Sequence, residues 1–434
     1  MKQVIHAPSF LSRYQQWWTK DRPLSVHDVE FAVLILRISA YAAQFLPSSC
    51  HTIDSIGGLF LADIRNTCSD VSYSLAQACL SLDWKGSLVR VQHNLYLALK
   101  YSCEGRTDKF WEGIAASSRA AQKAGIHAEA PFSGSNNTHN LEREIERRTL
   151  CSLYVLDSHL SRQLDRVPFL PDNLVAEALP RLRLVPDIGT DRTAPELFTE
   201  RLMQVQLGRF WRSFGPRRNV EYDPLQNEQR YDKFCAEYLP TLPPAFALEP
   251  NTQWDTNERK LPMQRQLLHI AIFDSICWNF RPLLLLQPTQ IASLAPYKQV
   301  LLQSQKRRLA LAALKVLEAV TALHTMFGGS HTRFAAIIFN TFEAAVLLLG
   351  LCCHADFPFG HGEEDTVLLG VKTGSLLDLL ELDGDARQMA LTEPLNPNWM
   401  FDSIPSMAQD GSYEGLQESQ LNLAAPWVFG DPLL

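Results

Sequence analysis

Apolar residues recur at intervals of three and four along nearly the whole chain, as far as about residue 382. This spacing indicates helices that bury one face, and no stretch of useful length alternates between polar and apolar residues as a half-buried strand does. Hydrophobic residues make up 46% of the 434 residues, which is enough to build a sizeable core. The sequence therefore predicts an all-α fold: one large, solenoid-like body of packed antiparallel helices.

Capping residues and breaks in the pattern divide this body into elements. Ser25 followed by Asp28 predicts a helix start, and Gly125 predicts a helix end. The proline-rich stretch 240–244 is the best candidate for an internal boundary. The expected helices cover about residues 25–44, 54–65, 69–82, 86–103, 107–124, 141–164, 195–213, 226–238, 258–286, 299–326, 331–353 and 364–382.

The stretch from Ala335 to Cys353 is apolar over nineteen residues, the length of a membrane span. It contains Asn340 and Glu343 near its centre, and a carboxylate there is costly in lipid. A helix enclosed by other helices gives the same pattern. We therefore predict that residues 335–353 are buried in the middle of the body, and we expect no membrane partner.

The C-terminal residues 388–434 differ from the rest, because they contain six acidic residues and no Lys or Arg. Trp399, Phe401, Trp427 and Phe429 are interspersed with the acids. Mixed acidic and aromatic residues are typical of disordered activation segments. The sequence thus predicts a regulatory domain over 1–387 and a partly disordered acidic tail over 388–434. The alternative is a tail whose aromatic side chains dock onto the helical body.

Charge and cysteine usage narrow the function classes. The formal net charge is −7, so the chain lacks the overall basic character of a nucleic-acid-binding domain, and we expect no direct sequence-specific DNA binding. Lys306-Arg307-Arg308 is either a minimal nuclear-import signal or a solvated helix face. The nine cysteines are odd in number and show no CxxC pair, which favours buried reduced thiols over disulfides or structural zinc.

Motifs of enzymes are missing: the sequence contains no HExxH, Walker loop, GxGxxG or GxSxG. We therefore predict no catalytic residues and no cofactor. One cluster is rich in metal-ligating residue types, but its spacing matches no standard site, so we predict no metal. This cluster comprises Cys352, Cys353, His354, His361, Glu363, Glu364 and Asp365.

The helix expected over 141–164 carries the most distinctive pattern. Acidic residues precede basic ones in its first turns, and an apolar stripe follows. Asp157 falls within the apolar part, where a carboxylate needs a partner. We predict that Asp157 is inaccessible and paired with Arg148 or Arg166. From periodicity alone, this is a core helix with a buried ion pair.

These residues resemble the signature of the fungal-specific transcription factor domain, the middle homology region of binuclear zinc-cluster regulators. That signature is an E-x-E-x-R-R-R-x-W helix, then Y-x-L-D-x-x-x-S, then a G-R-P turn. Asp165 and Val167 stand where Gly and Pro are usual, Thr149 where a third Arg is common, and Cys151 where an aromatic residue is. The matching residues are Glu144, Glu146, Arg147, Arg148, Tyr154, Leu156, Asp157, Ser161 and Arg166.

Weaker similarities extend over most of the chain in the family's order. They are Val91-Gln92 with Leu95-Tyr96-Leu97, the run from Trp111 to His127, and Phe280-Arg281-Pro282-Leu283. The resemblance implies an all-α regulatory body whose structural signature is Glu146, Arg147, Arg148, Asp157 and Arg166. Family members usually carry six clustered cysteines upstream, whereas the first cysteine here is Cys50.

The resemblance implies a nuclear transcriptional regulator of a metabolic or secondary-metabolite gene set. Such a protein would act through protein partners, among them a DNA-binding zinc-cluster relative, and through a small-molecule effector. An enzyme or small-molecule-binding protein on the same helical scaffold is the alternative, because fold does not determine function. A nonfunctional remnant is the third reading.

Overall fold

A computed structural model shows a mostly helical protein, which confirms the predicted fold class. The structure describes residues 4–19, 25–45, 55–82, 86–127, 137–172, 179–180, 195–196, 198–215, 222–327 and 335–354. These ranges contain twelve α-helices, short turns of other helix types and one small β-hairpin.

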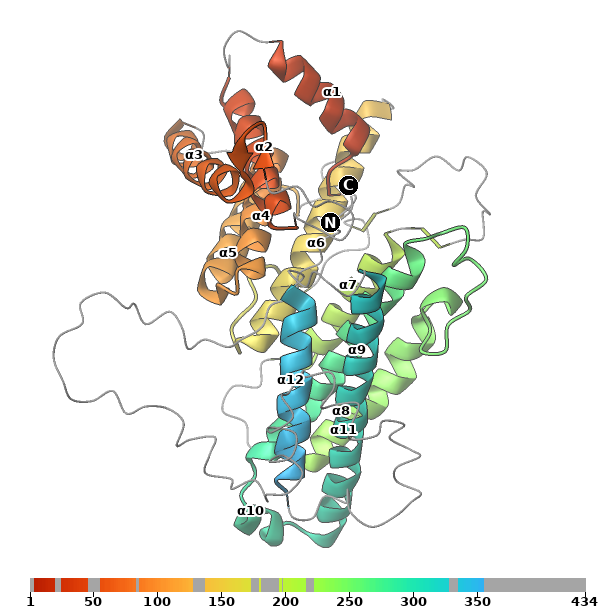
Figure 1. The fold of residues 1–434 in the computed structure, drawn as a ribbon. Coiled ribbons are helices and arrows are strands. Elements are labelled where there is room, and N and C mark those ends of the chain that lie inside the picture. Colours follow the sequence, from red (N-terminus) through yellow and green to blue (C-terminus); the bar gives the residue numbers. More distant parts are fainter. Residues whose placement is uncertain are drawn as a thin grey trace, which may run out of the picture.

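The N-terminal helices form one group, with α2 packed against both α3 and α4, and α4 packed against α5 (Figure 1). Gly113 allows a close approach of α5 to α4, because a Cβ atom there would lie 2.8 Å from the Cβ of Ala98. A two-stranded antiparallel hairpin, β1 (Ser55–Ile56) and β2 (Leu59–Phe60), precedes α3. The helices are α1 (Ala7–Trp18), α2 (Val26–Ala42), α3 (Leu61–Leu82), α4 (Leu88–Cys103) and α5 (Thr107–Lys123).

The C-terminal helices form a second group around α11, which packs against α8, α9 and α12. A π-helical turn, η3 (Phe234–Tyr238), continues α8, and a 3₁₀ turn, η6 (Arg281–Leu285), ends α9. The helices are α7 (Thr199–Arg212), α8 (Pro224–Lys233), α9 (Leu261–Phe280), α10 (Pro288–Ser293), α11 (Pro296–Met326) and α12 (Ala335–Cys352).

Helix α6 (Asn137–Gln163) connects the two groups: it packs against α4 and α5 on one side and α7 on the other (Figure 1). Its apolar stripe is buried as predicted, with Leu153 and Leu160 fully enclosed. Because α6 touches both groups, its polar side chains can link them.

Several local predictions are confirmed. Ser25 caps α2, since its hydroxyl oxygen accepts a hydrogen bond from the Asp28 amide at 3.2 Å. Gly125 follows α5 with a φ of +71°, the left-handed conformation that glycine favours after a helix. The cysteines at 79, 151 and 277 are free and buried as predicted, whereas Cys352 and Cys353 are free but exposed.

Other local predictions are wrong. The helices expected over 54–65 and 69–82 are the hairpin followed by one continuous helix, α3. Helices α1 and α10 were not predicted at all. The boundary suggested at the proline-rich stretch 240–244 stays a prediction; contacts do cross it, for example the hydrogen bond that the Asn279 side chain of α9 donates to the Asn227 carbonyl of α8 at 3.0 Å. The helix expected over 364–382 and the tail lie outside the described residues.

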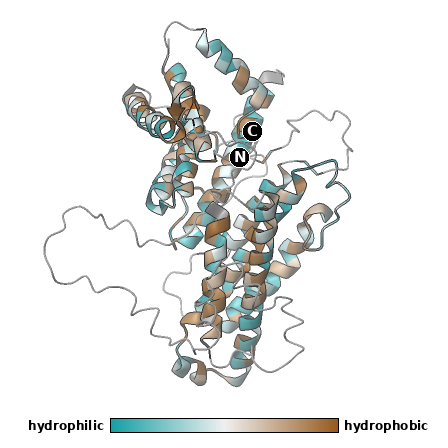
Figure 2. Cartoon of the chain, in the orientation of Figure 1, coloured by the Kyte–Doolittle hydropathy of each residue, from teal (hydrophilic) through white to brown (hydrophobic). Residues whose placement is uncertain are grey.

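The apolar helix α12 is not in the middle of the body, which corrects the prediction for 335–353. It packs on α11 through residues such as Ala344 and Leu351, while Ile338 and Phe342 on its other side are about half exposed. The central position belongs to α11. Among the described residues, α11 alone is long and apolar enough to span a membrane by length and composition, and burial against α8, α9 and α12 accounts for its apolar residues equally well. Figure 2 shows the hydrophobic residues along α12.

Candidate functional site along helix α6

The N-terminal part of α6 carries a fully buried ion pair. Arg148 donates from Nε to Glu144, one turn earlier, at 2.9 Å. Its Nη2 reaches Glu196, just before α7, at 2.5 Å, and its guanidinium lies 4.8 Å from the centre of the Phe198 ring. Arg148 and Glu144 are both inaccessible to solvent, so this contact fixes α6 to the start of α7.

The neighbouring signature residues are less tightly held. Glu146 and Arg147 are half-buried, and their nearest ionic contacts are both 3.9 Å long, to Arg143 and Glu144 respectively. Burial raises the pKa of Glu146. Of the consecutive arginines, therefore, Arg148 alone has a buried role.

Asp157 lies in the middle of α6 and is fully buried, as predicted. Its two carboxylate oxygens accept hydrogen bonds from the backbone amides of Phe169 and Leu170, at 3.0 and 2.9 Å. Arg212, at the end of α7, donates to the same carboxylate at 2.9 Å. Burial raises the pKa of Asp157, and the Arg212 charge and the two amides oppose this rise.

The predicted partner of Asp157 was wrong. Arg148 stands nine residues earlier on the same helix, which corresponds to about 13.5 Å along the axis, beyond the reach of an arginine side chain. Arg166 lies over the Trp111 ring, 5.2 Å from its centre. The partner of Asp157 is Arg212 instead. Arg212 also donates to the Leu170 carbonyl at 2.9 Å, and its guanidinium lies 4.3 Å from the centre of the Tyr154 ring.

The turn after α6 accounts for one departure from the family signature, at Asp165. Asp165, which stands in place of the usual glycine, has a φ of +49°. This is the left-handed region, which aspartate tolerates better than most residues. Phe169 follows it and packs against Trp111 with ring centres 4.4 Å apart. The turn thus has a left-handed residue at the position where the family usually has glycine.

The C-terminal part of α6 joins a second ionic cluster. Arg162 donates to Asp274 of α9 at 2.8 Å, and His159 approaches the same carboxylate at 3.8 Å. Beside them, Arg281 of η6 donates to Glu343 of α12 at 2.9 Å. Two arginines and two carboxylates from four elements are therefore brought together.

The charges of this cluster depend on one another. Burial raises the pKa of Glu343 to about 7; the Asp274 carboxylate adds to the rise, whereas Arg281 and Arg162 oppose it. Burial also raises the pKa of Asp274. Burial, with help from Arg162 and Arg281, lowers the pKa of His159 well below its usual range, so that this imidazole is neutral at pH 7.

Sequence reasoning missed most of these partners. Glu196, Arg212 and Asp274 lie far from the signature in the sequence. Asp274 gave one usable signal, because it is a carboxylate within the apolar run Ile270–Ile276. Arg281 belongs to the Phe280-Arg281-Pro282-Leu283 element, whose arginine now has a defined role: it binds Glu343.

The arrangement has little catalytic character. Each of the buried carboxylates at positions 144, 157 and 274 contacts an arginine, so none is aimed at an empty space. Within the described ranges, no three His, Cys, Asp or Glu side chains gather as metal ligands would. The cluster for which we predicted no metal lies partly outside those ranges, at His361, Glu363, Glu364 and Asp365.

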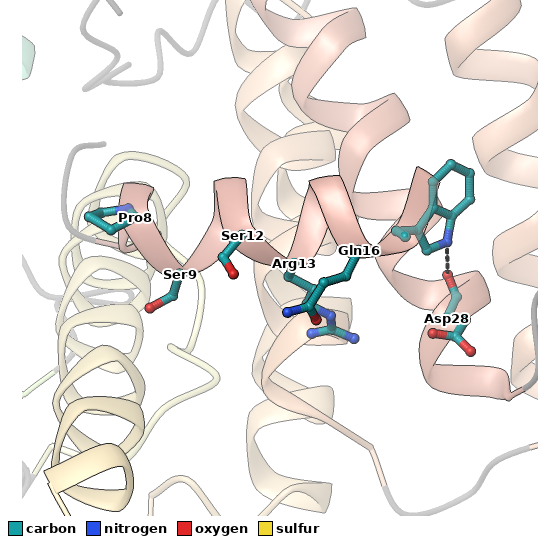
Figure 3. Close-up of a pocket in the computed structure, with 7 residues that line it drawn as sticks. Pro8, Ser9, Ser12, Arg13, Gln16 and Asp28 are labelled. Atoms are coloured by element: carbon teal, nitrogen blue, oxygen red, sulfur yellow. Dashed lines mark hydrogen bonds between the residues drawn. The ribbon is translucent and has the colours of Figure 1, made fainter. Parts of the chain in front are cut away.

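A groove of about 610 Å³ lies between α1 and α2 (Figure 3). The Trp17 indole closes one end by donating to the Asp28 carbonyl at 3.2 Å. Arg13 donates to the His27 carbonyl at 3.3 Å and stacks over Phe31, so its charge is already engaged. The groove is lined by Pro8, Ser9, Ser12, Arg13, Gln16, Trp17 and Asp28.

Comparison with known proteins gives two relatives. The chain is 64% identical over 382 residues to transcription factor xilB of Penicillium rubens, an alignment that covers 86% of this chain and 57% of xilB. It is 43% identical over 356 residues to the probable transcription factor sol4 of Alternaria solani, covering 81% and 63%. The chain therefore spans about three fifths of the length of these relatives. Solved structures provide no significant match.

A family model also matches, over residues 3–188, and its description is fungal specific transcription factor domain. The matched region contains α1–α6, so the signature helix α6 is its last described helix. Three partners of α6, namely Glu196, Arg212 and Asp274, lie beyond it. The buried contacts of α6 thus connect the matched region to the C-terminal helices. Over residues 3–188, the chain is thus similar to the fungal specific transcription factor domain.

Proposed function

We propose that this protein is a nuclear regulator of transcription that acts through protein partners. The proposal is carried by the 64% identity, over 86% of the chain, to a protein named as a transcription factor. The buried contacts of α6 support it, because in the part of the chain that the structure describes they hold helices together. The enzyme alternative has no comparable support.

A reporter experiment tests this function directly. The 434-residue chain is fused to an unrelated DNA-binding domain and directed to a reporter promoter. We expect reporter output to change relative to the DNA-binding domain alone. A matched fusion, with the six acids of 388–434 replaced by their amides, tests whether the tail supplies the effect. Unchanged output from the wild-type fusion, at equal protein level, would contradict the proposal.

The proposed partners include a DNA-binding zinc-cluster relative, and the proposed targets are a metabolic or secondary-metabolite gene set. The family resemblance supports both. Crosslinking and capture of the tagged full chain from nuclei should recover a zinc-cluster protein. Transcript profiling after deletion of the gene should show a coordinated change in one metabolic gene group. A change in unrelated genes only would reject the proposed target.

A small-molecule effector is a second candidate activity. The family resemblance supports it, and the groove of about 610 Å³ between α1 and α2 is the cavity to test. Metabolites are screened for a rise in the melting temperature of the full chain. A Ser12→Trp variant, which fills the groove, should lose that rise. A rise that persists in this variant would place the ligand elsewhere.

A further inference from the structure

Three polar layers lie between α2 and α4, spaced seven residues apart along α2 and the turn after it. In the first layer, Glu30 accepts a hydrogen bond from Arg90 Nε at 2.5 Å. In the third layer, Gln44 donates to the Glu104 carboxylate at 3.3 Å. Arg37 lies midway, seven residues from Glu30 and from Gln44. Both outer layers therefore contain a carboxylate, and the middle layer contains an arginine.

The contacts of Arg37 are with neutral groups. Its Nη1 donates to Nδ1 of His93 at 2.7 Å and to the Asn94 side-chain oxygen at 2.8 Å. Burial, together with the charges of Arg37 and Arg90, lowers the pKa of His93 well below its usual range, so this imidazole is neutral at pH 7. Burial lowers the pKa of Arg37 only to about 10, so the guanidinium keeps its charge.

This arrangement differs from that of other arginines in the protein. Arg37 is 4% exposed, and three more arginines of the described ranges are buried at least as deeply. Each of the three contacts a carboxylate at 2.9 Å or less: Arg90, Arg148 and Arg265. A buried charge is normally paired, because its desolvation is otherwise uncompensated. Among the described residues, no carboxylate forms such a pair with Arg37.

The carboxylates of the outer layers cannot complete this pair. Seven residues correspond to about 10.5 Å along a helix axis, which is too far for a hydrogen bond without a large movement. Both carboxylates are also engaged, since Glu30 is bound to Arg90 and Glu104 is bound to Lys100 at 2.9 Å. An anion for Arg37 must therefore come from outside these layers.

The geometry of the guanidinium indicates which anion fits. An arginine has two parallel N–H groups along the edge formed by Nε and Nη2, and these match two oxygens of a carboxylate or phosphate. Both hydrogen bonds of Arg37 leave from Nη1, and its buried Nε has no acceptor among the described residues. His93 and Asn94 thus hold the guanidinium from the other edge. Asn94 is half-buried, so one side of this layer reaches the surface.

We propose that Arg37 binds a small oxyanion, a carboxylate or phosphate group, between α2 and α4. The anion accepts two hydrogen bonds from the Nε edge, while His93 and Asn94 keep the guanidinium in place. Binding compensates the buried charge and so strengthens the contact between the two helices. Arg37 lies nine residues from Asp28 of the α1–α2 groove, about 13.5 Å along α2, so the two sites are distinct. The proposal does not depend on the function in transcription.

Thermal melting of the full 434-residue chain tests this site. Sodium phosphate and sodium acetate are compared with sodium chloride at equal ionic strength. In the wild type, we expect the melting temperature to rise with millimolar phosphate or acetate, because an anion that binds only the folded protein stabilises it. Arg37→Gln should weaken this binding by about tenfold or more, because hydrogen bonds from a charged group are lost.

The matched control is Arg147→Gln. Arg147 is a half-buried arginine of α6 whose carboxylate contact is 3.9 Å long, and its removal should leave the response to the anions unchanged. Arg37→Lys keeps the charge but lacks the two parallel N–H groups, so it should lose the response. Arg37→Met, which removes the buried charge and keeps much of the side-chain volume, replaces Arg37→Gln if the latter does not fold.

Two results would overturn the proposal. The first is a wild-type melting temperature that is the same in chloride, phosphate and acetate. The second is a rise of equal size in the wild type and in the Arg37 variants, which would be the general effect of such salts on protein surfaces. A response of the wild type and the control to one anion alone, absent from the Arg37 variants, supports the site and identifies which oxyanion it takes.

Discussion

Single buried residues of α6 determine how the chain continues after this helix. The Asp157 carboxylate receives two backbone amides and one guanidinium, and so it holds the turn at Phe169 and Leu170 and the end of α7 at once. Removing one member of such a buried pair leaves the other charge desolvated and uncompensated. Asp157 and Arg212 are therefore expected to be important for stability, with no need for either to touch a partner molecule.

The first prediction concerns Arg212, whose side chain is 8% exposed. Arg212→Ala should lower the free energy of unfolding by about 3–5 kcal/mol, because the Asp157 charge stays buried without its cation. Urea denaturation followed by circular dichroism measures this loss. Arg209→Ala, on the exposed side of the same helix, is the matched control and should change stability by less than about 0.5 kcal/mol.

A double variant separates the ion pair from other effects of the substitution. Asp157→Ala combined with Arg212→Ala should cost clearly less than the sum of the two single changes, since neither charge is left alone. Equal losses for Arg212→Ala and Arg209→Ala would contradict the assigned role of Arg212.

The second prediction concerns Asp165 and its φ of +49°. Asp165→Gly should be tolerated or stabilise the protein by up to about 1 kcal/mol, because glycine adopts this conformation without steric cost. Asp165→Val should destabilise by about 1–2 kcal/mol, because a β-branched side chain clashes there. Melting temperatures of the two variants measure the difference. Identical values for Gly and Val would argue against a left-handed residue at this position.

At the scale of elements, the contact among α6, α9, η6 and α12 is electrostatic. The groups that face one another are Arg162, Asp274, Arg281, Glu343 and the neutral His159. Glu343 shares this site with a second carboxylate, and burial raises its pKa to about 7. The folded protein therefore binds a proton on Glu343 at a pH where the unfolded chain has released it.

This linkage gives the third prediction. Between the ordinary pKa of a glutamate and about 7, the folded state holds the extra proton, so the contribution of Glu343 to stability is complete at the acidic end and is lost as pH rises through 7. Glu343→Gln removes the titration. The melting temperature of the wild type, relative to that of Glu343→Gln, should fall between pH 5 and pH 8. Parallel melting curves of the two proteins over this range would contradict the raised pKa.

At the scale of the whole molecule, the arrangement of charge limits how the protein can reach DNA. The basic run Lys306-Arg307-Arg308 is not a solvated patch: Lys306 is 1% exposed, and Arg308 is bound to Glu228. Arg307 is the one residue of the three on the exposed side of α11. The net charge of −7 opposes phosphate binding further.

The fourth prediction follows from this distribution. The purified 434-residue chain should show no site-specific affinity for promoter DNA at physiological salt, because specific recognition needs base contacts from a positioned element and many neutralised phosphates. Binding assays over a range of salt, with competitor DNA, measure this. Site-specific binding that survives competitor would show that the chain reads DNA by itself.

Local rules predicted most of the helices, because each depends on the spacing of apolar residues and on caps such as Ser25 and Gly125. They failed where a segment's structure depends on its neighbours. Helix α1 was missed; it contains no fully buried residue, and Phe10, Tyr14 and Trp17 pack against the core only in part. The predicted position of α12 was wrong, because an apolar sequence does not show how many sides of a helix are covered by other helices.

The sequence by itself determined the helical class, the buried face of α6 and the family signature, since all three are patterns among residues within a few turns of one another. It also determined that Asp157 is buried, because a carboxylate inside an apolar stripe has no other place. Only the tertiary structure decided which arginines form ion pairs with the buried carboxylates. Arg212 is 55 residues from Asp157, and Asp274 is 112 residues from Arg162. Such pairs depend on how whole helices pack, and the spacing of residues along the chain does not predict that packing.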